Sequence, residues 1–268
     1  MATSDFDSSD ADPSLIALLK VITYKKWILL VRYPVNTASE FLTLFIFFLL
    51  IFFGGQAIAG PALTDSLDGI IVGFFLFSLA ITSYSGLAWS VTREAQWGTL
   101  ERLYMSPHGL GTVMGVMTVV NVCFSFLWGL LLLILMMATT GRWLTFDPFS
   151  VVPLVFLTLM SVIGLGYLFG GLALIYKRIE NVFQLLQFGF IGLIAAPVNE
   201  IRWLMLLPVA HGSYFTRVVM EDAVRIWDLP AAELAILVIT STTYLLIGYY
   251  CFYRAGRIAR MRGVMGHY

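Results

Sequence analysis

The chain has 268 residues, and its 16 basic and 16 acidic side chains give a formal net charge of zero at pH 7. Hydrophobic residues make up 59% of the chain and charged residues 12%, whereas soluble domains average about 45–50% apolar and about 25% charged residues. The balanced charge argues against a nucleic-acid partner, and the apolar composition argues against an ordinary soluble domain.

The first twelve residues are polar and contain four acidic side chains but no basic one. A secretory signal peptide begins with a positively charged segment. We therefore expect residues 1–12 to form a disordered acidic tail and not a cleavable leader.

Residues 13–34 have the pattern of an amphipathic helix that starts at Asp12-Pro13 and ends at Pro34. An Asp N-cap followed by Pro is a common helix start. Lys26 interrupts the apolar face and can extend its charge towards water. We interpret the segment as a helix along the inner membrane surface, with an ordinary cytoplasmic lead-in helix as the alternative. The apolar face holds Leu15, Leu18, Leu19, Ile22, Leu29, Leu30 and Tyr33.

Six stretches without Asp, Glu, Lys or Arg follow. A helix needs about 20 apolar residues to cross the hydrocarbon core, and all but the fifth stretch reach that length. We therefore predict an all-α, polytopic membrane protein with six transmembrane helices in a single domain. Thr37 and Glu40 form a capping-box pattern before the first stretch. The stretches are residues 41–64, 69–92, 103–141, 148–176, 182–199 and 234–253.

The basic residues alternate between the two sides of the predicted spans. Lys and Arg in the two ends of the chain and in the second and fourth connections total 12, against 4 in the other connections. The positive-inside rule then places both termini in the cytoplasm. We expect a multi-pass protein of the plasma membrane.

The connection formed by residues 199–230 mixes apolar residues with scattered charges. Its apolar stretches are too short to span, which favours re-entrant or interfacial helices. We therefore predict that the fifth span is broken at its outer end and that an extracytoplasmic re-entrant segment follows it.

The second connection, residues 93–107, has the pattern of a short amphipathic helix. The residue before a Pro disfavours the α conformation, so Ser106-Pro107 should end it. Such a helix can lay one face on the membrane or on the spans and present the other to a cytoplasmic partner. The first face holds Trp97, Leu100, Leu103 and Tyr104, and the second holds Glu94, Gly98, Glu101 and Arg102.

This segment reads Glu-x-x-x-Gly-Thr-Leu-Glu-x-Leu-x-x-Ser-Pro, and it resembles the signature of the permease subunits of type 2 ABC exporters. The resemblance extends to the length of the chain, the six predicted spans, the amphipathic N-terminal helix and, more loosely, Pro197, Leu207-Pro208 and Arg217. The matching residues of the signature are Glu94, Gly98, Thr99, Leu100, Glu101, Leu103, Ser106 and Pro107.

The resemblance implies a permease that moves a drug, lipid, glycan or other amphiphile out across the membrane by alternating access. It implies that residues 93–107 are the coupling helix, which docks on a separate ATP-binding subunit, and that a second permease copy, identical or different, completes the transporter. The residues implied in coupling are Glu94, Trp97, Gly98, Thr99, Leu100, Glu101 and Arg102.

The positions of the lysines indicate that this chain has no ATP-binding P-loop of its own. A phosphate-binding P-loop needs a Gly-Lys pair followed by Ser or Thr, and none of Lys20, Lys25, Lys26 and Lys177 follows a glycine. We expect ATP and Mg²⁺ on the partner subunit, and no cofactor, metal or catalytic residue on this chain.

A secondary transporter or channel is the alternative. Carriers usually keep ionisable groups inside their spans, but the six stretches contain no Asp, Glu, Lys or Arg. His211 and His267 lie outside the stretches, and His108 lies near the start of the third, directly after Pro107. No selectivity-filter pattern is present. An enzyme would need a nucleophile with a base, or metal ligands at suitable depth, and the sequence shows neither a His-Glu-x-x-His pattern nor an intramembrane Asp pair. Cys123 and Cys251 are too few for a disulfide framework.

Polar residues within the spans are candidates for the substrate path, although hydroxyl side chains often bond to their own helix and amides often join helices. Gly166-x-x-x-Gly170 and Gly111-x-x-x-Gly115 fit close helix packing, either within one subunit or at a dimer interface. The candidates for the path are Ser78, Thr82, Ser83, Ser85, Asn121, Ser125, Gln184 and Gln187.

Overall fold

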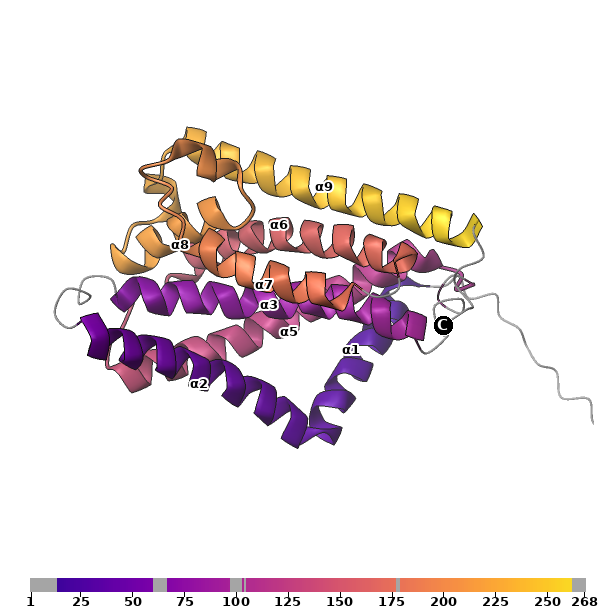
Figure 1. Ribbon diagram of the computed structural model, residues 1–268, viewed down its shortest axis with the longest axis horizontal. Helices are drawn as coiled ribbons and strands as arrows, with labels where there is room; N and C mark the ends of the chain where they lie inside the picture. The colour runs from indigo at the N-terminus through magenta and orange to yellow at the C-terminus, as the bar shows by residue number, and fades with distance from the viewer. Residues whose placement is uncertain (1–13, 60–66, 97–102, 104, 177–178, 262–268) are drawn as a thin grey trace, which may run out of the picture.

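The computed structural model describes residues 14–59, 67–96, 103, 105–176 and 179–261 (Figure 1). These residues form helices and connecting turns, with no strand among them, and the all-α prediction is confirmed for this part of the chain. The long helices are α1 (Leu15–Arg32), α2 (Pro34–Ala59), α3 (Leu67–Gln96), α5 (Gly109–Thr140), α6 (Pro148–Ile175) and α9 (Ala231–Met261). The shorter ones are α7 (Glu180–Ile194), α8 (Ala210–Glu221) and the 3₁₀ turns η2 (Arg202–Leu206) and η3 (Ile226–Asp228).

Five helices are long and apolar enough to cross a membrane, namely α2, α3, α5, α6 and α9. They correspond to the predicted spans one, two, three, four and six. The predicted fifth span is α7, which has 15 residues and a length of roughly 22 Å. That is less than the hydrocarbon core of about 30 Å. The described part of the chain therefore has five candidate spans by length and composition, consistent with a multi-pass membrane protein.

Local chemistry explains several of the helix ends. Asp147 is the N-cap of α6, where its carboxylate accepts a hydrogen bond from the backbone N–H of Phe149, and Pro148 takes the first helical position. Both features favour a helix start, and the helix begins where the fourth uncharged stretch begins. The preceding helix, α5, ends at Gly141, whose φ of 69° is the left-handed conformation that glycine adopts without strain.

The first span starts earlier than the sequence suggested. It begins at Pro34, directly after α1, and not near residue 41. Thr37 and Glu40 therefore lie inside α2, where the Thr37 hydroxyl donates to the backbone oxygen of Tyr33. The predicted capping box is wrong, because Pro34 already supplies a helix start one turn earlier. Asp12 and Pro13 lie outside the described residues, and Ser14 is the N-cap of α1.

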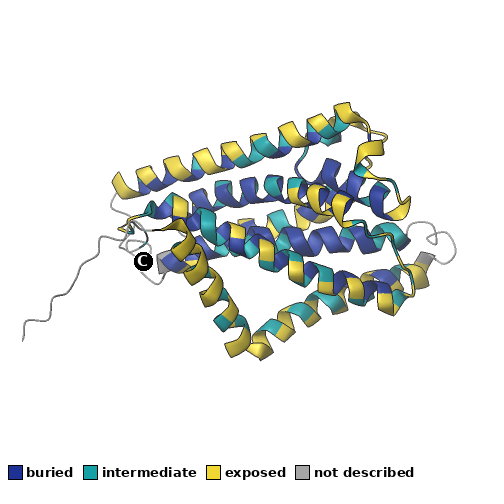
Figure 2. Cartoon of the chain, turned by 180° about the vertical axis from the view of Figure 1, so that it is seen from behind, coloured by how far each residue is buried: buried dark blue, intermediate teal, exposed yellow. Residues whose placement is uncertain are grey.

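Helices α1 and α2 meet in a V whose apex points away from the other helices (Figure 1). No residue of α1 is fully buried. Only 11% of the apolar window of α2 is buried, against 67% for α3 and 61% for α6. Figure 2 shows the same contrast, with exposed positions along α1 and α2 and buried ones along the central helices. The core of the bundle is therefore α3 with α6, and α1 and α2 lie at its periphery.

The region predicted as re-entrant contains η2, α8 and η3. Helix α8 is largely buried and packs on α3, α6 and α7. Two hydroxyls fix it in place: the Ser161 hydroxyl accepts from the backbone N–H of Val209, and the Ser213 hydroxyl donates to the backbone oxygen of Ile194 at the end of α7. Residues 195–230 thus fold back against the spans, so that α8 lies within the bundle.

The closest helix pair is α6 with α9. A Cβ added to Gly248 would lie 2.6 Å from the carbonyl carbon of Gly164, so the two backbones touch. Three of the four glycines in the predicted small-residue motifs, Gly111, Gly166 and Gly170, face residues of α3 or α9 within the same subunit. A Cβ on the fourth, Gly115, would meet nothing within 4 Å.

Candidate functional site

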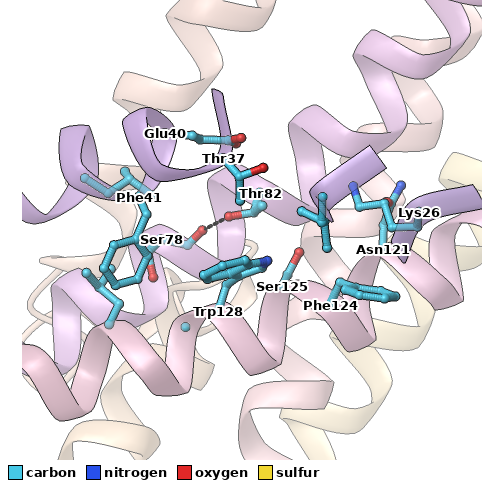
Figure 3. Close-up of a pocket in the computed structure, with 14 residues that line it drawn as sticks. Lys26, Thr37, Glu40, Phe41, Ser78, Thr82, Asn121, Phe124, Ser125 and Trp128 are labelled. Atoms are coloured by element: carbon cyan, nitrogen blue, oxygen red, sulfur yellow. Dashed lines mark hydrogen bonds between the residues drawn. The ribbon is translucent and has the colours of Figure 1, made fainter. Parts of the chain in front are cut away.

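A polar pocket lies where α1 and α2 meet α3 and α5 (Figure 3). Its volume is about 80 Å³, the space of two or three water molecules at roughly 30 Å³ each. The polar residues at the pocket are Lys26 from α1, Thr37 and Glu40 from α2, Ser78 and Thr82 from α3, and Asn121 and Ser125 from α5. Four helices thus bring hydroxyl, amide and charged groups to one place in an apolar bundle.

The α3 wall of the pocket carries hydroxyls that are bonded to their own helix. The Ser78 hydroxyl donates to the backbone oxygen of Phe75 at 2.7 Å, and the Thr82 hydroxyl donates to the backbone oxygen of Ser78. Their protons are used within α3, so each oxygen can still accept a hydrogen bond from a ligand. This wall therefore offers acceptors to a donor group.

The α5 wall combines an amide with aromatic rings. Asn121 lies against α3 because Gly86 has no side chain there: a Cβ on Gly86 would be 3.1 Å from the Asn121 Nδ2 atom. Trp128 packs against Phe41 of α2, with ring centroids 5.7 Å apart. The pocket thus has a polar end near Asn121 and an aromatic end near Trp128, which suits a molecule with a polar head and an apolar body.

The charges of the pocket come from its two peripheral helices. Burial lowers the pKa of Lys26, the attraction of Glu40 opposes this effect, and the repulsion of Arg93 adds to it. A partly buried ammonium group without an ion pair among the described residues is well placed to attract an anionic or strongly dipolar head. The only sequence signal for this residue was that Lys26 interrupts the apolar face of its helix.

A second cleft continues from the pocket towards the end of α3. Its volume is about 170 Å³, and it shares Lys26 and Asn121 with the pocket. Its far wall includes Glu94, whose carboxylate lies 3.9 Å from the Lys25 ammonium group. Glu94 is the first residue of the signature segment, so the cleft that shares Lys26 and Asn121 with the pocket also reaches the start of that segment.

The structure divides the predicted substrate-path residues into two groups. It brings Ser78, Thr82, Asn121 and Ser125 together at the pocket. The others do not line it: Ser83 is buried, Ser85 is partly buried, Gln184 is exposed and Gln187 is partly exposed on α7. Sequence spacing could not separate the two groups, because it does not tell which side of a helix faces the neighbouring helices.

Most of the predicted coupling residues lie outside the described part of the chain, namely Trp97, Gly98, Thr99, Leu100, Glu101 and Arg102. Glu94 is the described member of this set, and it is 9% exposed at the end of α3. After the segment, Ser106-Pro107 forms a turn in which the Ser106 oxygen accepts from the N–H of Gly109, and α5 begins. The helix predicted to end at Ser106-Pro107 lies mostly outside the described residues.

A comparison with protein-family models gives no matching family, and a comparison with curated proteins gives no significant match. The class of the molecule that the fold defines is therefore an all-helical, multi-pass membrane protein with a polar pocket among its spans.

Proposed function

We propose that this chain is the permease subunit of a type 2 ABC exporter that moves an amphiphile out of the cell. The observation that carries the proposal is that the pocket shares Lys26 and Asn121 with a cleft lined by Glu94, because a place for a ligand then lies next to the start of the signature segment. A transporter needs such a link between its substrate site and the part of the chain on which an energy source acts.

In this proposal the pocket belongs to a closed conformation of the permease, in which no substrate can enter. At about 80 Å³ it is too small for an amphiphile, since ligand sites usually have about 300–1,000 Å³. Helices α1 and α2 have the least buried surface to lose when they move. Separation of α2 from α3 and α5 therefore opens the pocket, and the tightly packed pair of α6 and α9 stays in place.

The energy comes from a separate ATP-binding subunit, which holds ATP and Mg²⁺. Residues 93–107 connect α3 to α5, so a partner that grips this segment moves two helices that line the pocket. In this proposal both termini and residues 93–107 lie in the cytoplasm. The sixth crossing is formed by α7 together with the re-entrant α8. A second permease copy is related to this one by a twofold axis.

The first experiment isolates the tagged chain from its native membrane and identifies the proteins that accompany it. The proposal requires an ABC ATP-binding subunit among them, with ATP hydrolysis that vanadate inhibits. Glu101→Arg should reduce capture of that subunit, or uncouple hydrolysis from transport, because it reverses a charge expected to face a basic groove. Gly98→Leu should act likewise by blocking close approach.

The matched control is Arg225→Gln, which changes the charge of the chain far from residues 93–107, just before α9. If both signature variants retain the ATPase subunit and its activity as the parent does, the coupling role is wrong. If no ATP-binding subunit accompanies the parent chain, the proposed class is wrong.

Labelling of single cysteines tests the orientation independently. Cysteines at Asp65 and Arg225 should react with an impermeant reagent added outside, and one at Arg102 should not, as the distribution of Lys and Arg implies. Outside labelling at Arg102 would contradict the proposed topology.

A further inference from the structure

A basic cleft lies between the end of α9 and the start of α5, away from the pocket described above. Its volume is about 830 Å³, and three arginines of α9 line it, namely Arg254, Arg257 and Arg260. His108, at the start of α5, lines the opposite side. No carboxylate lines the cleft, and none of the three arginines forms an ion pair with a carboxylate in the described part of the chain.

The α5 side of the cleft also favours an anion. Helix α5 starts at Gly109, and its N-cap, His108, makes no side-chain capping bond to the first turn. The first backbone N–H groups of a helix lack partners within the helix, and the helix dipole adds positive potential there. Three guanidinium groups and this helix start therefore converge on one space, and none of the described residues that line it carries a negative charge.

The wall between these charges is aromatic. Tyr249, Phe252 and Tyr253 line it, and the Arg257 guanidinium lies 5.6 Å from the centroid of the Tyr253 ring. The Tyr249 hydroxyl reaches the α5 backbone, since a Cβ on Gly111 would lie 2.8 Å from it. Tyrosine beside arginine at the end of a spanning helix is typical of the membrane–water interface.

We propose that this cleft binds the headgroup of an anionic phospholipid from the leaflet at the arginine-rich end of α9. The phosphate contacts the arginines, which bind phosphate through paired N–H groups. The acyl chains lie along the apolar surface of α9, where Leu246 and Tyr250 are exposed. Basic pockets between spanning helices on the cytoplasmic side bind such headgroups in general.

A lipid fits the cleft better than an acidic protein segment does. The cleft is bounded by the last turns of a helix long enough to cross the membrane, and the surface beyond its aromatic wall is apolar and exposed. The inference requires that α9 spans the membrane, but it does not require an ATPase subunit. Its test is therefore independent of the proposed transport function.

The experiment measures binding of fluorescent phosphatidylglycerol and phosphatidylcholine to the purified full-length chain in neutral detergent. The parent should prefer phosphatidylglycerol, and the preference should weaken as salt rises from 50 to 500 mM, because screening shortens the reach of the charges. Arg254→Gln/Arg257→Gln should weaken phosphatidylglycerol binding by roughly fivefold for each arginine, hence about 25-fold. Arg202→Gln/Arg225→Gln removes the same charge near the other end of α9 and should leave binding unchanged.

Three outcomes would overturn the proposal. The first is equal binding of the two lipids by the parent. The second is full competition by inorganic phosphate at the concentration of the lipid, which would show that a free anion is the ligand. The third is unchanged lipid binding in the Arg254/Arg257 variant together with lost capture of a partner protein, which would make the cleft a protein-docking surface. Arg254→Lys/Arg257→Lys keeps the charge and should retain most binding, and the salt series on the parent tests the idea even if the glutamine variant does not fold.

Discussion

The contact between Gly164 and Gly248 should control the stability of the bundle. Gly248→Ala adds a methyl group whose carbon would lie 2.6 Å from the Gly164 carbonyl carbon and 2.8 Å from its Cα atom. Carbon atoms pack best at about 3.5–4.0 Å, so α6 and α9 must separate by roughly 1 Å. These neighbours are backbone atoms of Gly164, which cannot rotate away as a side chain would.

The expected cost is about 3 kcal/mol of unfolding free energy, at the upper end of the usual cost of overpacking. A gain of up to about 1 kcal/mol from replacing a helical glycine by alanine is included in that figure. Gly115→Ala is the matched control, because its Cβ would meet nothing within 4 Å. It should keep or slightly raise stability.

The assay is reversible unfolding in mixed micelles, followed by circular dichroism. The double variant Gly164→Ala/Gly248→Ala should cost less than the sum of the single changes, because the first separation of the helices makes room for the second methyl group. If Gly248→Ala matches Gly115→Ala in stability, the close approach of α6 and α9 is refuted.

Two further changes test the interior and the pocket. Thr118→Val removes the 3.1 Å hydrogen bond between the hydroxyls of Thr118 and Tyr167. It should cost about 1–3 kcal/mol of unfolding free energy in the same assay, because the Tyr167 hydroxyl stays buried without a partner. The control is Thr240→Val, whose hydroxyl bonds only to its own helix and whose loss should cost less than about 1 kcal/mol; equal losses in the two variants would contradict the hydrogen bond between Thr118 and Tyr167. Burial lowers the pKa of Lys26 below its usual 10.5, so between the lowered pKa and 10.5 the unfolded chain binds more protons than the folded one, and stability rises with pH. Lys26→Met should remove this rise and stabilise the chain at pH 7. A parent protein whose melting temperature is constant from pH 8 to 10.5 would contradict the burial of this ammonium group.

Hydropathy predicted the spanning helices because membrane crossing is a property of composition and length. The interior of each long helix was predicted from the absence of charge. The limits of the uncharged stretches at Gly141 and Pro148 coincide with helix ends, which the structure explains by a left-handed glycine and an Asp147 N-cap. The start of the first span was missed because Thr37 was interpreted as the N-cap and Glu40 as its capping-box partner, whereas α2 already begins at Pro34.

The pocket was predicted only in part, since it depends on how helices far apart in the sequence pack. Ser78 and Ser125 are polar residues in apolar runs, and the sequence marks both equally with Ser83 and Gln184 as candidates. Only the packing of α3 against α5 decides which of them share a space. Lys26 enters the pocket because α1 folds back towards α5, an arrangement that an amphipathic pattern does not specify.

The division between a rigid and a mobile part follows from the same packing. The Gly164–Gly248 contact and the largely buried α3 favour a fixed scaffold, whereas α1 and α2 have little buried surface and border the pocket. A ligand shifts an equilibrium only by its differential affinity for the two states. An amphiphile in the pocket would contact α2 and α5 together, and it therefore favours whichever spacing of these helices fits it. The Lys25 ammonium group of α1 lies 3.9 Å from the Glu94 carboxylate at the end of α3. In the proposed function, a change of that spacing therefore also affects the start of residues 93–107.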